Sequence, residues 1–504
     1  MKNTVIINKE FVLGAIEKDV WGSFIEHMGR AVYDGIYEPS HPLADEQGFR
    51  KDVMDAVRAL HVPKVRYPGG NFLSGYDWRD GIGKDRPVRL DLAWGQLETN
   101  EVGLHEFCGW AEMVGAEVMM SVNMGTGTPK DAAQLVEYCN HEKGTAISDL
   151  RRRNGREKPF GIRTWCIGNE MDGDWQICAL TAEEYGRKAA ETAKMMRWVD
   201  HDIELVVCGS STPDQKTYPE WDRIVLQHTY NYVDYLSMHR YYTYPDDTQN
   251  VTDFLSSHTD FDAFIKTVAS AADYVKAYKR SKKVMKISVD EWNIWHTKPA
   301  PNGLDVHNDC CEARWTRGAR RLENIYDLAD ALALAGMACT LINNADRVKM
   351  GCLAQLVNVI APIFTQPGGG LFRQTIYYPY QMAIQFAKGQ ALRTVVRGEQ
   401  MASRYGDTEK VYTACAYQNG TYALFAVNKT AEAQDCDLDF QVTPVRMIER
   451  IELSGELHAY NCLEEPEKVV PKNVACERGT ERIHTVRLPA YSFTLLRFAE
   501  EKSN

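Results

Sequence analysis

The stretch Arg163-Thr-Trp-Cys-Ile-Gly-Asn-Glu-Met-Asp172 decides the fold of this chain. An apolar run rich in β-favouring residues stops at Gly168, and an amide and a carboxylate follow at Asn169 and Glu170. A strand that ends in this way presents its last side chains at one edge of a sheet. In an eight-stranded α/β barrel, that edge is the face that carries the functional residues.

A second stretch, Lys286-Ile-Ser-Val-Asp-Glu-Trp-Asn293, has the same form and places Glu291 where a strand is expected to end. The two glutamates are far apart in the chain. They meet only if the fold brings both strand ends to one face. Whether Glu170 and Glu291 lie close together therefore depends on the arrangement of the remaining strands.

Short apolar strands alternate with helical stretches from about residue 16 to residue 385. The helical period is clearest in Ala182–Val199, Phe261–Lys279 and Arg320–Ala335. This alternation predicts a parallel sheet, and eight units over this length fit a (β/α)8 TIM barrel, with an open doubly wound sheet as the alternative. The predicted strands are Val20–Ile25, Val62–Tyr67, Glu117–Val122, the strand before Gly168, Glu204–Cys208, Tyr235–Met238, the strand ending at Glu291, and a strand near Gly351–Leu356.

The pattern changes after residue 385. Two strand-like runs, Val411–Tyr417 and Thr421–Val427, flank Gln418-Asn419-Gly420, which is the signal of a tight hairpin. Met447–Leu453 and Thr485–Phe498 continue as strands, with no long helix between them. We therefore predict a second domain over residues 386–504, an all-β sandwich of jelly-roll-like form that a strand from residues 1–15 joins.

Composition narrows the functional classes. The chain has 504 residues, 44% of them hydrophobic, which suffices for a large core in two domains. Its net charge of −11 argues against a nucleic-acid partner, which would call for a basic surface. No apolar run reaches the roughly 18 residues of a membrane span, and the first residues lack the pattern of a signal peptide. We therefore expect a cytoplasmic protein without membrane contact.

Cysteine usage agrees with that compartment. Thirteen cysteines are scattered without a spacing pattern, Cys310 and Cys311 are adjacent, and no Cys-x-x-Cys pair occurs. We expect reduced thiols, most of them buried as small hydrophobic side chains. No cluster of zinc-ligand residues is visible in the sequence, so we predict neither a metal site nor a cofactor.

Two carboxyl groups on one face suit one reaction in particular. Hydrolysis of a glycosidic bond takes one carboxyl group to protonate the leaving oxygen and another to attack the sugar or to activate water. The ends of the fourth and seventh strands face each other across a barrel mouth, so Glu170 and Glu291 would flank a sugar placed there. A single strand-end glutamate is more often part of an ion pair. Here both lie in a polar and aromatic context, with Trp175 near one and Trp292 and Trp295 near the other.

Further segments narrow the class. Gly168-Asn169-Glu170 and Asp290-Glu291-Trp292-Asn293 look like the acid/base and nucleophile motifs of a large clan of retaining glycosidases built on this barrel. Together with other ordered segments they resemble the α-L-arabinofuranosidases of glycoside hydrolase family 51, along nearly the whole barrel. Those segments are Gly22-Ser-Phe-Ile-Glu-His-Met-Gly-Arg-Ala-Val-Tyr33, Gly35-Ile-Tyr-Glu-Pro39, Arg66-Tyr-Pro-Gly-Gly-Asn-Phe72, Tyr76-Asp-Trp-Arg-Asp-Gly81 and Ala354-Gln-Leu-Val-Asn358.

The resemblance implies a role for each matching residue. Glu170 would be the general acid/base, Glu291 the nucleophile, and Trp94 would meet the leaving group. From their positions at strand ends, Arg66 and His239 are expected to orient the carboxylates from behind. The sugar would be held by Glu26, Asn71, Asn169, Tyr241, Gln355 and Trp295, with Asn169 on the 2-hydroxyl and Trp295 as a wall.

The predicted activity is that of a retaining, exo-acting α-L-arabinofuranosidase, which removes terminal non-reducing arabinofuranosyl units from arabino-oligosaccharides by double displacement. Retention predicts carboxyl groups about 5–5.5 Å apart, and inversion about 6.5–9.5 Å. The family resemblance also implies a homo-oligomer, such as a hexamer built as a trimer of dimers.

Three other interpretations stay open from the sequence. One is another retaining glycosidase of the same clan, a β-xylosidase or an endoglucanase. A second is a non-catalytic sugar-binding barrel, against which the presence of both Glu170 and Glu291 argues. A third is a phosphate-binding barrel enzyme, with Gly368-Gly-Gly370 after the eighth strand as its loop, although Leu-Phe-Arg follows those glycines.

Overall fold

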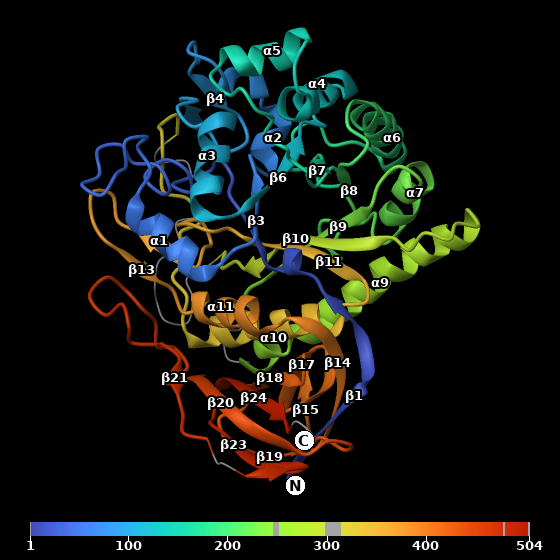
Figure 1. Ribbon diagram of the computed structural model, residues 1–504, viewed down its shortest axis with the longest axis vertical. Helices are drawn as coiled ribbons and strands as arrows, with labels where there is room; N and C mark the ends of the chain where they lie inside the picture. Colours follow the sequence, from blue (N-terminus) through green and yellow to red (C-terminus); the bar gives the residue numbers. More distant parts are fainter. Residues whose placement is uncertain (1, 245–250, 298–313, 477–478, 502–504) are drawn as a thin grey trace.

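The computed structural model describes residues 2–244, 251–297, 314–476 and 479–501. Parallel strands close into a barrel in the order β10-β11-β2-β3-β6-β7-β8-β9 (Figure 1). This order follows the chain, as expected when each strand is followed by a helix that returns the chain to the start of the next strand. The strands are β2 (Gly22–Phe24), β3 (Lys64–Tyr67), β6 (Glu117–Val122), β7 (Thr164–Ile167), β8 (Glu204–Val207), β9 (Tyr235–Tyr242), β10 (Lys286–Ile294) and β11 (Val348–Ala354).

Helices cover the outside of the barrel, and the TIM-barrel prediction is confirmed. The covering helices are α1 (Lys51–Leu60), α3 (Leu104–Val114), α4 (Pro129–Asn140), α6 (Ala182–Val199), α7 (Glu220–Thr229), α9 (Ser257–Tyr278), α10 (Leu328–Asn343) and α11 (Tyr377–Phe386). Shorter elements lie in the connections: η1 (Lys18–Trp21), α2 (Asn71–Gly75), η2 (Trp78–Gly81), β4 (Arg89–Asp91), β5 (Gln96–Glu98), α5 (Ala146–Arg153), α8 (Val251–Leu255), β12 (Ile363–Thr365) and β13 (Leu371–Arg373).

Three predicted elements differ from the observed ones. The first predicted strand begins as the 3-10 helix η1, and only its last part is β2. The helix predicted from Arg320 begins at Leu328, because Leu322 has a left-handed φ of 48° and the Asp327 side chain caps the first turn. The sixth strand, predicted to end before His239, runs on to Tyr242 because β9 stays paired with β10.

The C-terminal part of the chain forms a single curved sheet, and this sheet includes β1 (Asn3–Ile16). β1 pairs antiparallel with β14 and parallel with β19. The sheet folds over a shared apolar core, in which the ring of Phe440, directly after β19, lies 4.7 Å from that of Phe498 in β24, although β19 and β24 are far apart in the pairing order. The other strands are β14 (Gly389–Arg397), β15 (Gln400–Ser403), β16 (Gly406–Glu409), β17 (Val411–Gln418), β18 (Thr421–Asn428), β19 (Gln434–Asp439), β20 (Val445–Ser454), β21 (Lys472–Asn473), β22 (Thr480–Glu481), β23 (Ile483–Leu488) and β24 (Ser492–Glu500), of which β15 and β16 pair only with each other.

The hairpin between β17 and β18 confirms the prediction from Gln418-Asn419-Gly420. Gln418 pairs with Thr421, which leaves a two-residue turn. Asn419 and Gly420 have φ values of 51° and 78°, the left-handed conformation that a type I′ turn needs at both central positions. The predicted run Thr485–Phe498 is instead two strands, β23 and β24, because the chain turns at Tyr491 with a φ of 42°.

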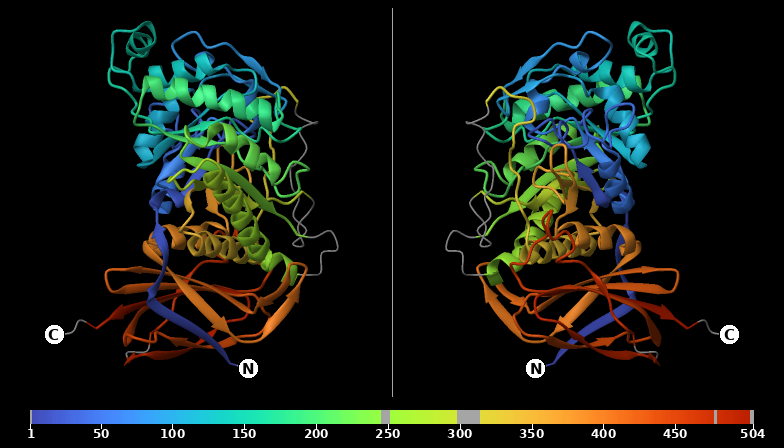
Figure 2. Two further views of the ribbon diagram at one scale, coloured as in Figure 1. Left: turned by 90° about the vertical axis from the view of Figure 1, so that its right-hand side faces the viewer. Right: turned by 90° about the vertical axis from the view of Figure 1, so that its left-hand side faces the viewer.

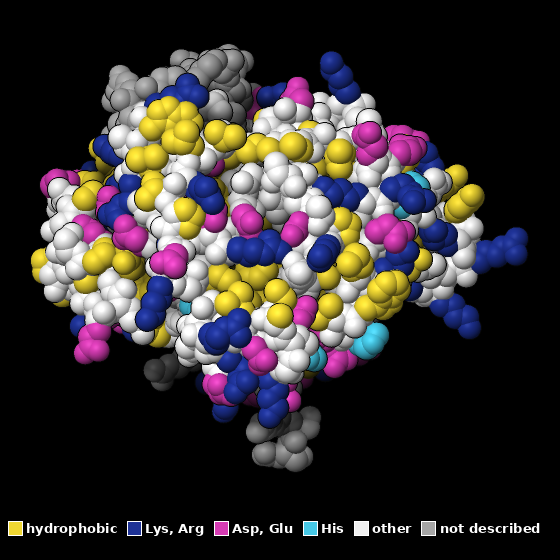
Figure 3. Space-filling view, turned by 90° about the horizontal axis from the view of Figure 1, so that it is seen from above, with side chains coloured by type: hydrophobic (Ala, Val, Ile, Leu, Met, Phe, Trp, Pro, Cys, Tyr) yellow, Lys and Arg dark blue, Asp and Glu magenta, His cyan; other side chains and the backbone are white. Residues whose placement is uncertain are grey.

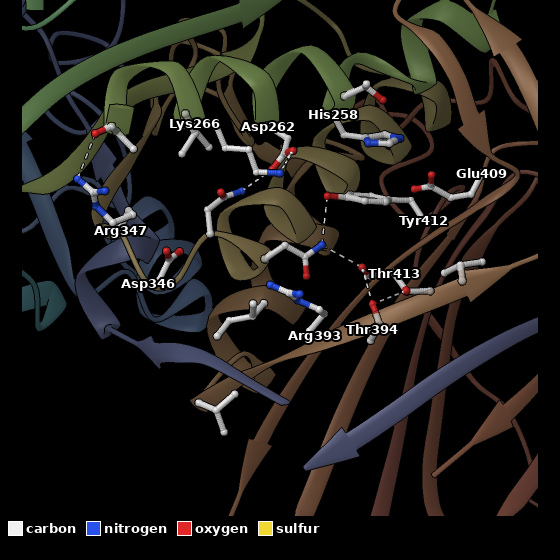
Figure 4. A pocket seen from close by; sticks show the side chains of 18 of the residues that line it. His258, Asp262, Lys266, Asp346, Arg347, Arg393, Thr394, Glu409, Tyr412 and Thr413 are labelled. Carbon is white, nitrogen blue, oxygen red and sulfur yellow. Dashed lines mark hydrogen bonds and ion pairs between the residues drawn. The ribbon is translucent and has the colours of Figure 1, made fainter. Parts of the chain in front are cut away.

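The helix α10 lies between the barrel and the sheet (Figures 1 and 2). Nearly all its residues are buried, which explains why its sequence is apolar on every side. At its end, Asn343 Nδ2 donates to the hydroxyl of Tyr412, and the Tyr412 ring stacks on His258 of α9 at 3.8 Å. A polar cleft of about 840 Å³ lies between α9 and the sheet at this point (Figure 4).

The surface and the cysteines fit the composition. Seen from above, lysine and arginine side chains alternate with aspartate and glutamate, without a broad basic area on that face (Figure 3). Of the described helices, none has the length and apolar character needed to cross a bilayer. The cysteines of the described residues are free thiols, most of them buried, and Cys310 and Cys311 lie outside that part of the chain.

Candidate active site

A cavity of about 580 Å³ lies at the carboxyl ends of the barrel strands. Two of the predicted residues, Arg66 and His239, are packed behind its wall and are only 1% and 2% exposed. The larger cleft beside α9 holds none of the predicted residues. The other predicted site residues all line the cavity: Glu26, Asn71, Trp94, Asn169, Glu170, Tyr241, Glu291, Trp295 and Gln355.

Glu170 follows β7 in an unusual backbone conformation. Its φ is 41°, which a glutamate rarely adopts, and Gly168 two residues earlier has a φ of 91°. The carboxylate accepts hydrogen bonds from His239 Nδ1 at 2.8 Å and from Trp175 Nε1 at 2.6 Å. Burial raises the pKa of Glu170, but the hydrogen bond and charge of His239 and the hydrogen bond of Trp175 outweigh burial and hold the pKa below its ordinary value.

Glu291 lies within β10, next to an irregularity in the pairing with both neighbouring strands. Each of its carboxylate oxygens has a donor. Arg66 Nη1 binds Oε1 at 2.7 Å, and the Tyr241 hydroxyl binds Oε2 at 2.7 Å. The carboxylate is thus fixed in orientation and faces the cavity with little freedom to rotate.

The two glutamates meet across the cavity. One carboxylate oxygen of Glu170, one of Glu291 and a ring nitrogen of His239 all lie within 4.8 Å of one another. A separation this short leaves no room for the water that an inverting enzyme places between sugar and carboxylate, and it agrees with a retaining enzyme.

His239 sits between the two glutamates and rests on Asp290. Its Nε2 lies 3.4 Å from Asp290 Oδ1, and the hydroxyl of Ser237 donates to the same carboxylate at 2.5 Å. Burial disfavours the imidazolium, but the charge of Glu291 and the contacts with Asp290 and Glu170 outweigh it and raise the pKa of His239 to about 10.

The same three side chains are the one group among the described residues whose atoms are close enough to hold a metal ion. A metal ligand must be deprotonated, whereas the raised pKa of His239 keeps the imidazole in its charged form. We therefore interpret Glu170, His239 and Glu291 as a proton-handling cluster.

Arg66 links the carboxylate of Glu291 to the amide of Asn169. Its Nη1 reaches Glu291, and its Nη2 donates to Asn169 Oδ1 at 2.6 Å. Asn169 Nδ2 donates to Gln176 Oε1 at 3.3 Å, and Gln176 Nε2 donates to Ser74 Oγ at 2.6 Å. The planar guanidinium can hold two groups in one geometry, which an ammonium cannot do.

Glu26 also lines the cavity. Its Oε1 accepts from Trp94 Nε1 at 2.8 Å and from the backbone N–H of Phe72 at 3.0 Å. Burial raises the pKa of Glu26 to about 8 despite these hydrogen bonds, so this carboxyl group holds its proton at neutral pH. Gly69 allows the close approach, because a Cβ there would lie 2.7 Å from Glu26 Cγ. Gln355 Oε1 accepts from the backbone N–H of Glu26 at 2.9 Å.

Asn71 lines the cavity, and its amide also holds a neighbouring loop. Its Nδ2 donates to the carbonyl of Trp175 at 2.9 Å, and its Oδ1 accepts from the N–H of Ile177 at 2.9 Å. The amide thereby anchors the loop that carries Trp175. Trp295 stands edge-on to the ring of Tyr241, with centroids 5.6 Å apart, and forms part of the wall.

Sequence reasoning gave no role to Asp290, to Gln176, or to the rim residues Thr212, Asp214 and Arg240. Asp290 stood in the motif before Glu291, so its position in the sequence was a usable signal. The rim residues come from the ends of β8 and β9, and nothing in their local sequence distinguishes them from ordinary loop residues.

The glycines Gly368-Gly-Gly370 turn the chain between β12 and β13. The N–H of Gly368 donates to Glu38 Oε1 at 2.6 Å, and the carbonyl of Gly369 accepts from Arg50 Nη2 at 2.8 Å. A carboxylate already occupies the amide that a phosphate would need, which argues against the phosphate-binding interpretation.

A barrel with two facing carboxylates at the ends of its fourth and seventh strands, beside a cavity with room for a sugar, has the arrangement of a glycoside hydrolase. Two family models match the chain: the "Alpha-L-arabinofuranosidase 1 domain" over residues 56–260 and the "Alpha-L-arabinofuranosidase C-terminal domain" over residues 290–492. The chain belongs to the α-L-arabinofuranosidases of glycoside hydrolase family 51.

Individual relatives agree with this membership. The chain is 50% identical to intracellular exo-α-(1→5)-L-arabinofuranosidase 1 of Bacillus subtilis, over 87% of each chain. It is 51% identical to an intracellular exo-α-(1→5)-L-arabinofuranosidase of Halalkalibacterium halodurans, over 84% of each chain. A solved family 51 α-L-arabinofuranosidase from Bifidobacterium longum superposes with a TM-score of 0.92 at 38% identity, covering 98% of this chain and 99% of that one.

Proposed function

We propose that this protein is a retaining exo-α-L-arabinofuranosidase, with Glu291 as nucleophile and Glu170 as general acid/base. One observation supports this assignment above the others: carboxylate oxygens of the two glutamates within 4.8 Å of each other, in a chain of the α-L-arabinofuranosidase family. Likeness to a glucanase-xylanase at 12% identity reflects the shared fold and does not favour an endo-acting alternative.

The mechanism has two steps. Glu291, oriented by Arg66 and Tyr241, attacks the anomeric carbon while a proton passes to the leaving oxygen from Glu170. The imidazolium of His239, 2.8 Å from Glu170 Oε1, is a source of that proton. In the second step Glu170 is a base that takes a proton from water, and its lowered pKa suits this step.

The sugar would be held by groups with complementary chemistry. The protonated carboxyl group of Glu26 can donate to a sugar hydroxyl, which a carboxylate cannot do. Asn169, fixed by Arg66, is placed to bind the hydroxyl next to the anomeric carbon, a contact that strengthens as positive charge develops on the ring.

The relatives' names support the biological setting. We propose α-(1→5)-linked arabino-oligosaccharides as substrates and an intracellular location. Both relatives described above are named as intracellular exo-α-(1→5)-L-arabinofuranosidases. We further propose a homo-oligomer, and a division into a catalytic barrel over residues 16–385 and a β-domain over residues 386–504 that includes residues 1–15.

The test is hydrolysis of a chromogenic α-L-arabinofuranoside by the wild type, Glu291→Ala and Glu170→Ala, with and without azide. Loss of activity in Glu291→Ala, with azide rescue that gives an inverted arabinosyl azide, would establish the nucleophile. Rescue of Glu170→Ala with a retained azide product would establish the acid/base, because azide then attacks the covalent intermediate. Wild-type activity on β-xylosides in place of arabinofuranosides would refute the substrate assignment.

A further inference from the structure

The cavity is larger than the sugar that the proposed mechanism places in it. An arabinofuranosyl group has roughly nine non-hydrogen atoms, and water's share of liquid volume, about 30 Å³, is a generous allowance for each. Such a group needs less than about 270 Å³ by this allowance. The cavity of about 580 Å³ therefore has space for a second unit.

The position of Glu170 shows where that second unit lies. The leaving oxygen must be within reach of Glu170, so the leaving group lies next to this residue. The cavity lining near Glu170 includes Trp175, whose Nε1 donates to Glu170, and Arg240, which follows His239 in β9. Thr212 and Asp214 also line the cavity, and both contact Arg240. Asp172 links the loop that carries Trp175 to the loop that carries Thr212 and Asp214, because its carboxylate accepts a hydrogen bond from the N–H of Ser211 at 2.9 Å.

Arg240 has a fixed position in this lining. Its Nε and Nη2 both donate to Asp260, at 3.0 and 2.7 Å, and its guanidinium lies over the Tyr242 ring at 4.6 Å. The remaining nitrogen, Nη1, lies 3.1 Å from Asp214 Oδ2 and 3.4 Å from Thr212 Oγ1. Arg240 thus keeps its position without any help from Asp214.

Asp214 contributes little to the fold at this place. Its side chain is 80% exposed, and an ion pair so open to water has a small effect on stability. The contacts given by the described residues all go to Oδ2, namely those from Arg240 and Thr212. Oδ1 is thus left at the cavity rim as an acceptor for a ligand.

We propose that Thr212, Asp214 and Arg240 form a polar aglycone subsite that binds the hydroxyl groups of a sugar leaving group. This inference rests on the proposed function and extends it to the substrate's second unit. Asp214 accepts from a hydroxyl of that unit, and Trp175 faces it from the other side. The subsite favours an arabinosyl leaving group over a planar aryl group, which offers no hydroxyl at that place.

The experiment compares kcat/KM for α-(1→5)-arabinobiose with that for 4-nitrophenyl α-L-arabinofuranoside in the wild type, Asp214→Ala and Asp214→Asn. We expect the ratio of the two values to fall about 10-fold in Asp214→Ala, the effect of one hydrogen bond to a charged group, and less in Asp214→Asn. The control is Asp435→Ala, which removes another exposed aspartate paired with an arginine, Arg487, in the C-terminal sheet. It should leave the ratio as in the wild type.

An unchanged ratio in Asp214→Ala would overturn the subsite while leaving the proposed function intact, as would equal loss on both substrates. Absence of wild-type hydrolysis of both arabinofuranosides would instead refute the proposed function, and the subsite with it.

Discussion

Replacing Trp175 with phenylalanine should move the alkaline limb of the pH–activity profile to higher pH. Trp175 Nε1 donates to Glu170 over 2.6 Å, and this bond lowers the pKa of Glu170. Phenylalanine keeps an aromatic face but has no donor. In the proposed mechanism the leaving group takes its proton from Glu170, which draws it from His239, so activity falls at high pH as this pair loses its proton. A raised pKa of Glu170 therefore extends activity to higher pH.

The size of the shift follows from the strength of the bond. A hydrogen bond to a charged group contributes about 1.5–3 kcal/mol, and one pKa unit corresponds to about 1.36 kcal/mol. Because Trp175 is 48% exposed, water replaces part of the lost interaction and the lower end of the range applies. We expect the limb to move up by about one unit.

The assay is kcat/KM for an arabino-oligosaccharide from about pH 5 to about pH 11, since a sugar leaving group needs the proton more than nitrophenol does. Trp94→Phe is the matched control, because it removes an indole donor from Glu26, a carboxyl group of the same cavity whose pKa is raised. A limb that moves in Trp94→Phe and stays in place in Trp175→Phe would refute Glu170 as the titrating acid and point to Glu26.

Two further predictions concern the residues around the sugar. Glu26→Gln mimics the protonated carboxyl group. Because the folded-state pKa of about 8 lies above the ordinary 4.5, folding of the wild type loses up to about 5 kcal/mol between those pH values, and the glutamine variant does not. Calorimetry should therefore show the Tm of the variant rising relative to the wild type from pH 4.5 to pH 8, and a constant difference would contradict the raised pKa. Arg66→Lys should lower kcat/KM by about 10- to 100-fold, because an ammonium lacks the rigid, spread-out donors with which the guanidinium holds Glu291 and Asn169 in one geometry. A loss below about twofold would show that this link between Glu291 and Asn169 is dispensable.

Features that depend on local pattern could be predicted from the sequence. The strand before Gly168 and the run ending at Glu291 are apolar because they lie inside the barrel, so their ends mark the catalytic face. The hairpin at Asn419-Gly420 follows from the φ values that those residues tolerate. The start of α10 could also have been predicted from the sequence, because Asp327 followed by Asp330 is a capping pattern.

Features that depend on distant residues could not be predicted. Arg66 holds a carboxylate from β10 and an amide that follows β7, a pairing visible only after the barrel has closed. Asn71 anchors the Trp175 loop because that loop passes over it. The pKa of Glu26 depends on burial by elements from several parts of the chain. In each case the chemistry arises from tertiary placement, which a single sequence encodes only indirectly.

The pairing of β1 with the C-terminal sheet has a consequence for how the chain can be assembled. Ile6 pairs with Val395, about 390 residues away, and closing a loop of that length in an unfolded chain costs about 5 kcal/mol in entropy. Once the barrel has closed, however, its first and last residues emerge side by side, since Ile16 pairs with Gly389. The barrel thus turns a contact between opposite ends of the polypeptide into a local one.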